Sequence, residues 1–189
     1  MTIEIQIHRG SIAGNIPRKL ITKAIEVIAS EFGWSDAEIS VAVVDDPEIH
    51  RVNRQFLQHD YPTDVISFDT TESDTLLEGE IVVSVDTARR IAEENGWNGD
   101  HELLLYVVHG MLHIVGLDDK APADIEEMRQ AERHFMELLV ADVRVCAETE
   151  EPQPSEGPTG QPMVPANPAR ARRTRTPIHR KPSDPNGNE

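Results

Sequence analysis

The sequence has few of the features that mark secreted or membrane proteins. Its 189 residues contain one cysteine, Cys146, so an internal disulfide framework is excluded. It also has no apolar run near the roughly 20 residues that a membrane-spanning helix needs. The N-terminal residues lack the basic segment followed by an apolar run that is typical of a signal peptide. We therefore expect a cytoplasmic protein with no membrane association.

Basic residues are scarce in most of the chain. Residues 1–147 contain 12 Lys and Arg against 28 Asp and Glu, which accounts for the whole net charge of −16. Residues 148–189 contain six of each kind. A basic surface is the usual electrostatic mark of a nucleic-acid-binding protein, so composition by itself argues against this class.

The composition changes near residue 148. Nine of the thirteen prolines lie beyond this point, and the apolar periodicity ends there. Such a segment buries too little apolar area to offset the entropy lost on ordering. We predict one domain over residues 1–147 and a disordered Pro-rich tail over 148–189. The tail contains a basic cluster, which is either a solvated segment or an RNA-tethering arm. Its members are Arg170, Arg172, Arg173, Arg175, Arg180 and Lys181.

Short apolar segments alternate with amphipathic ones in the first 147 residues. Strands are predicted at 3–7, 39–44, 65–68 and 81–84. Helices are predicted from Pro17, from Asp46, from Ser84 or Asp86 to Ala92, over 102–115, and from Pro122 to about Val140. Two consecutive strands without a helix between them exclude a plain doubly wound sheet. The pattern therefore predicts an α+β fold with a single mixed sheet of about four strands, packed with helices.

Two histidines on the penultimate predicted helix suggest a metal site. His109 and His113 are four residues apart, which places both imidazoles on one helix face, one turn apart. Gly116 follows, and glycine allows the left-handed residue that ends a helix. The resulting turn would return Asp118 or Asp119 to the histidines. Two histidines and a carboxylate are normal zinc ligands that leave a position open for water, which is typical of a catalytic site.

The spacing matches the metzincin protease pattern H-E-x-x-H-x-x-G-x-x-H/D in four places: His109, His113, Gly116 and Asp119. It departs from that pattern at Gly110, where the protease has its general-base glutamate. Loss of a general base typically costs about 100- to 10,000-fold in rate. Peptidase activity is therefore not expected.

The same stretch more closely resembles the YbeY family of bacterial metallo-endoribonucleases, whose motif runs H-G-x-L-H-x-x-G-Y-D-H. His109, Gly110, Leu112, His113, Gly116 and Asp118 match it. Two further segments match in the family's order, one from Asn53 to Phe68 that contains Pro-Thr-Asp-Val-Ile-Ser-Phe, and one over 79–84. The resemblance covers about residues 3–140. It implies that His109, His113 and Asp119 hold one zinc ion per chain.

The chain has Glu80 where the family usually has an aspartate, and it departs from the family pattern at three further positions. Asp119 replaces the third histidine of the motif, Leu117 replaces a tyrosine, and Leu57 replaces an arginine that is considered functionally important in the family. A carboxylate still ligates zinc, although it shifts the preference toward harder ions. Arg54, on the same predicted helix, is a candidate to supply the lost charge.

The resemblance implies a zinc-dependent, single-strand-specific endoribonuclease that acts on rRNA in small-subunit maturation and in ribosome quality control. Its partners would be single-stranded RNA and the small ribosomal subunit. No residue of the motif is an obvious general base; Asp64 and Glu80 are candidates, and Asp64 is equally suited to cap a turn beside Thr63. The alternative is a ribosome-associated metal-binding factor with little or no catalytic activity, which Leu57 and the acidic domain favour.

Overall fold

The fold is built on one mixed sheet formed by the alternating apolar segments. The computed structural model describes residues 2–10, 12, 14–147 and 178–179. Its strands are β1 (Thr2–Arg9), β2 (Asp36–Val44), β3 (Val65–Asp69), β4 (Leu77–Ser84) and β5 (Ile178–His179). Its helices are α1 (Arg18–Glu31), α2 (Asp46–Val52), the π-helical turn η1 (Asn53–Leu57), α3 (Val85–Asn95), α4 (Gly99–Ile114) and α5 (Pro122–Ala147).

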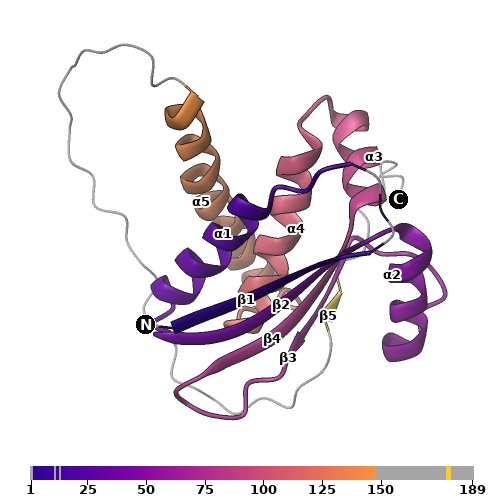
Figure 1. Ribbon diagram of the computed structural model, residues 1–189. Helices are drawn as coiled ribbons and strands as arrows, with labels where there is room; N and C mark the ends of the chain where they lie inside the picture. Colours follow the sequence, from indigo (N-terminus) through magenta and orange to yellow (C-terminus); the bar gives the residue numbers. More distant parts are fainter. Residues whose placement is uncertain (1, 11, 13, 148–177, 180–189) are drawn as a thin grey trace.

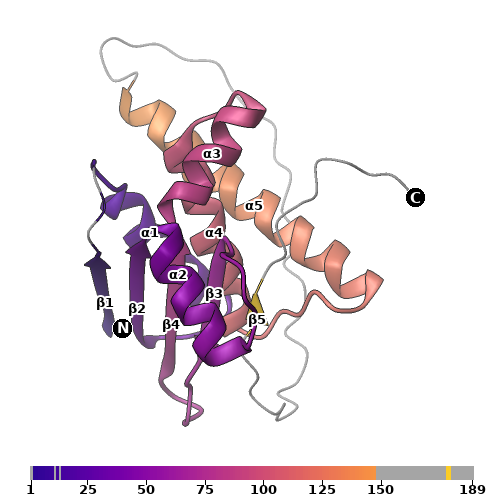
Figure 2. The ribbon, with the colours of Figure 1, turned by 90° about the vertical axis from the view of Figure 1, so that its right-hand side faces the viewer.

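The strands lie side by side in the order β1, β2, β4, β3, β5 (Figure 2). β1, β2 and β4 are parallel, whereas β3 runs antiparallel to β4. This reversal arises because no helix separates β3 from β4, so the two strands form a hairpin. The predicted α+β fold with a single mixed sheet of about four strands is confirmed. The two-residue strand β5, which pairs antiparallel with β3, was not predicted.

The helices cover the two faces of the sheet unequally. On one face, α4 contacts β3, β4 and the helices α1, α3 and α5, which places it at the centre of the main core (Figure 1). Apolar residues at every second position of β1, β2 and β4 point into this core. On the other face, α2 and η1 cover only the end of the sheet near Val44 and Ile66. No described helix covers the rest of that face, which is called the open face below.

The helix ends follow local capping signals. Ser84 caps α3, since its hydroxyl accepts a hydrogen bond from the backbone N–H of Thr87 at 3.1 Å. Asn98 caps α4 in the same way through the N–H groups of Asp100 and His101, so this helix begins three residues earlier than predicted. α5 continues past Val140 to Ala147.

The predicted tail lies mostly outside the described residues. This applies to its predicted disorder and to every member of its basic cluster. The exception is β5, whose residues Ile178 and His179 pair with Ser67 and Ile66 at the edge of the sheet. Among the described residues, no helix combines the length and the hydropathy needed to cross a lipid bilayer.

Candidate metal centre

The two histidines of the motif project from the last two turns of α4. Both are buried, with 2 % of His109 and 6 % of His113 exposed. Their Nε2 atoms lie 3.0 Å apart and their ring planes are nearly perpendicular, at 88°. The helical spacing of four residues therefore brings the two imidazoles together on one face, as the sequence predicted.

The turn after α4 returns the chain toward the histidines. Gly116 has a φ of 108°, the left-handed conformation that glycine adopts without a steric cost. The N–H groups of Gly116 and Leu117 donate to the carbonyls of His113 and Leu112, both at 3.0 Å, which is the pattern of a Schellman motif. The predicted glycine turn is confirmed.

Asp119 completes a group of three that could hold a metal ion. Its Oδ2 lies 3.9 Å from Nε2 of His109 and 3.9 Å from Nε2 of His113. A point about 2.1 Å from all three donor atoms exists within this triangle, which matches the ~2.0–2.2 Å bonds of zinc to nitrogen and oxygen. The Asp119 side chain is 27 % exposed, so the group is open to solvent on its side.

The outer nitrogens of both histidines are engaged by other groups. Nδ1 of His109 lies 2.6 Å from Oε1 of Glu132 on α5, and Nδ1 of His113 lies 2.9 Å from the carbonyl oxygen of Leu117. Both partners accept hydrogen bonds, so each Nδ1 donates, and an imidazole that carries this one ring proton presents its lone pair at Nε2. Two lone pairs and a carboxylate oxygen thus converge, an arrangement that a cation stabilises.

Electrostatics keep His113 in the form that a metal requires. Burial, helped by the neighbouring His109, lowers the pKa of His113 from its ordinary 6.5 to about 4. The imidazole is therefore neutral at physiological pH, and its lone pair is available without the loss of a proton.

Gly110 faces the sheet. A Cβ atom at this position would lie 3.0 Å from Cγ2 of Ile81 and 3.2 Å from Cγ2 of Val65. The glycine thus lets α4 approach β3 and β4 closely at the turn that carries His109. Metzincin proteases have their general-base glutamate at this position. In this chain the same position packs against the sheet.

The candidate Glu80 does not lie at this centre. Glu80 is exposed and alternates along β4 with Gly79 and Ile81, the two residues that face α4, so it lies on the opposite face of the sheet. The buried Asp64 accepts hydrogen bonds from the Thr63 hydroxyl at 3.0 Å and from the N–H of Val65 at 2.9 Å. These contacts fix the carboxylate beside the residues that flank it in the chain.

Arg54 and Leu57 lie on the π-helical turn η1. Arg54 is exposed, while Leu57 packs against the small apolar cluster under α2. Position 57, where the resemblance implied an arginine, is thus used for packing in this chain. Helical turns of the π type are frequent at functional sites, which keeps Arg54 a candidate for contact with substrate.

Sequence reasoning missed Glu132. This residue is 8 % exposed and lies in the middle of α5, 23 positions after His109. The one available signal was an acidic residue among apolar ones on the inward face of that helix, close to the buried Met128 and Phe135. The Asp118 carboxylate accepts a hydrogen bond from the N–H of Asp119 at 2.9 Å. The Nδ1 contacts of the two histidines are with Glu132 and Leu117.

Comparison with known proteins matches the chain to one family. The sequence profile described as endoribonuclease YbeY matches residues 2–140. The chain belongs to this family. A relative from Rhodopirellula baltica, also called endoribonuclease YbeY, is 48 % identical over 123 residues, which cover 64 % of this chain and 63 % of that protein. The match thus spans less than two thirds of that relative's own length.

Other YbeY proteins match over more of their length. The Bacteroides thetaiotaomicron protein is 41 % identical over 66 % of this chain and 90 % of its own. The Chlorobium phaeovibrioides protein is 34 % identical over 74 % of this chain and 93 % of its own. A solution structure from Thermotoga maritima superposes with a TM-score of 0.57 at 28 % identity, and covers 82 % of this chain and all of that one.

Proposed function

We propose that this YbeY family member is a zinc-dependent endoribonuclease that cleaves single-stranded RNA in the maturation and quality control of the small ribosomal subunit in the cytoplasm. The observation that carries the proposal is the convergence of His109, His113 and Asp119 with both Nδ1 atoms already engaged. Such a site binds one ion per chain and leaves a position open. The names of the relatives support RNA as the substrate.

Each residue of the centre has a distinct part in this proposal. His109 and His113 hold the ion through Nε2, while Glu132 and the Leu117 carbonyl fix the two rings. Asp119 offsets part of the ion's charge on the side that is open to solvent. When bound, zinc lowers the pKa of a coordinated water and polarises a phosphoryl oxygen. Arg54 is a candidate to contact the RNA backbone.

Cleavage assays test the proposal directly. The intact protein should cut single-stranded RNA slowly, lose activity to a chelator, regain it with zinc, and leave peptides intact. His113→Ala, purified identically, should be inactive because it removes one ligand. Cleavage at equal rates by His113→Ala would assign the activity to a contaminant. The products also identify the nucleophile, since attack by the 2′-hydroxyl leaves a cyclic phosphate and attack by water leaves a linear one.

A second candidate is a ribosome-associated metal-binding factor with little catalytic activity. Two observations favour it: Leu57 packs where the family has an arginine, and residues 1–147 carry the whole net charge of −16. Leu57→Arg tests it. A gain of cleavage would show that the missing cation limited the reaction, and no gain in a folded variant that binds zinc would support a binding role.

A further inference from the structure

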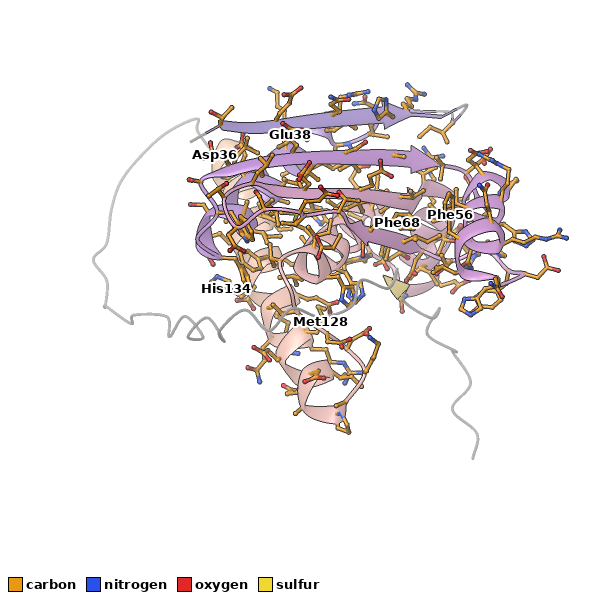
Figure 3. All side chains as sticks on the ribbon, turned by 90° about the horizontal axis from the view of Figure 1, so that it is seen from below. Asp36, Glu38, Phe56, Phe68, Met128 and His134 are labelled. Atoms are coloured by element: carbon orange, nitrogen blue, oxygen red, sulfur yellow. The ribbon has the colours of Figure 1, made fainter. Side chains whose placement is uncertain are left out.

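The open face of the sheet is strongly acidic. Strand pairing places Glu4 beside Glu38, and Glu38 beside Glu78, so that three carboxylates form a row across β1, β2 and β4. The next row contains Glu80, which lies between Ser40 and Phe68. Figure 3 shows this face, with Asp36 and Glu38 toward one end and Phe68 and Phe56 nearer to α2.

This row is unfavourable by itself. Neighbouring strands are about 4.8 Å apart, and like charges directly opposite one another destabilise a sheet. Within the described residues, the carboxylates of Glu38, Glu78 and Glu80 make no ion pair or hydrogen bond, and Glu4 has only a 3.4 Å contact with the Gln6 amide. The open face therefore concentrates negative charge that the rest of the folded domain does not offset.

The chain itself contains a segment of opposite charge. Residues 170–181 include six Lys and Arg and no acidic residue. The 22 residues between Ala147 and Arg170 can extend over roughly 70 Å, enough to cross the domain. Independently of charge, β5 lies inside this segment and pairs with β3, so the chain returns to the edge of this same sheet (Figure 2).

We propose that residues 170–181 dock on the acidic face formed by Glu4, Glu38, Glu78 and Glu80. The pairing of β5 with β3 anchors the segment at the edge, and its arginines offset the row of glutamates. Docking would also reduce the negative potential that this domain presents to an approaching polyanion. Docking of this segment requires no activity at the metal centre.

Paramagnetic relaxation measured by NMR tests the docking on the full chain. A nitroxide label is attached at Thr174→Cys in a Cys146→Ser background, so that it sits in the middle of the basic segment. At low salt, the amide signals of Glu38, Glu78 and Glu80 should broaden. They should recover in high salt, because the attraction between exposed charges is screened.

Two matched triple variants distinguish the effect of the charge on this face from the effect of the net charge of the domain. Glu38→Gln, Glu78→Gln and Glu80→Gln together should abolish the broadening, and should not lower the melting temperature because they remove repulsion. Glu26→Gln, Glu127→Gln and Glu137→Gln make the same charge change at exposed helical positions and should leave the broadening intact. Equal broadening in both triple variants, broadening centred on α1 or α5, or no broadening in the labelled parent would each overturn the proposal. If the labelled parent shows no broadening and the segment makes contact only with added RNA, the segment would be assigned to RNA tethering.

Discussion

Oε1 of Glu132 lies 2.6 Å from Nδ1 of His109, and the two residues come from helices that are joined only through the loop that carries Asp119. The contact is buried at both ends, with 10 % of the Glu132 side chain and 3 % of the His109 side chain exposed. A carboxylate in this position fixes both the orientation and the tautomer of a metal-binding imidazole. The centre therefore depends on α5 as well as on the motif in α4.

Removal of this carboxylate should weaken metal binding. We expect Glu132→Ala to lower zinc affinity by about 10- to 100-fold, and Glu132→Gln by less, because an amide oxygen still accepts from Nδ1. Competition with a chromophoric chelator measures the affinity without any activity assay. Glu127→Gln, an exposed change on the same helix, is the control and should bind zinc as the parent does. Parental affinity in Glu132→Ala would show that the contact is only structural.

Asp119 and Asp118 should differ in their effect on the metal. Asp119→Ala removes a donor atom that lies 3.9 Å from each Nε2, whereas the Asp118 carboxylate contacts the Asp119 N–H and the Lys120 amine. We therefore expect a sharp loss of zinc affinity for Asp119→Ala and a smaller one for Asp118→Ala. Titration of both variants with zinc under the same conditions measures the two affinities. A greater loss for Asp118→Ala would reverse the assignment.

Gly110→Ala should destabilise the fold. The added methyl group would press on Ile81 and Val65 at 3.0 and 3.2 Å, and overpacking of a core typically costs about 1–3 kcal/mol. Gly99→Ala is the matched control in the same helix, because its Cβ would make an ordinary 3.7 Å contact with Arg89. Urea denaturation of both proteins measures the difference. Equal unfolding free energies would mean that the helix and sheet adjust to the methyl group at little cost.

The metal-free protein should lose stability in mild acid. The pKa of His113 is about 4 in the folded state and 6.5 in the unfolded state, so only the unfolded chain takes up this proton as the pH falls below 6.5. The stabilisation is complete above pH 6.5 and is lost as the pH falls toward 4. Urea midpoints measured in a chelator across this range test the loss. His113→Gln should show a smaller dependence, and an equal slope in that variant would exclude His113 as the cause.

The sequence predicted what short-range periodicity and local geometry determine. The strands, the mixed sheet, the spacing of His109 and His113 and the turn at Gly116 all follow from patterns within a few residues. Glu132 could not be predicted, since only the packing of α5 on α4 brings it to His109. The position of Glu80 was hard to assign for a different reason. The face of a strand that packs against α4 depends on the register of the whole sheet. That register places Glu80 beside Phe68 on the open face.

The close fit of Gly110 against Ile81 and Val65 limits how this site could change by mutation. The chain differs from the zinc protease pattern at one central position, Gly110, and a glutamate there would complete that pattern in the sequence. Position 110 points into the sheet, however, and a carboxylate there would be buried among aliphatic side chains, away from the ion. In spite of the shared spacing of His109, His113 and Asp119, a base at position 110 would therefore require α4 to move away from the sheet.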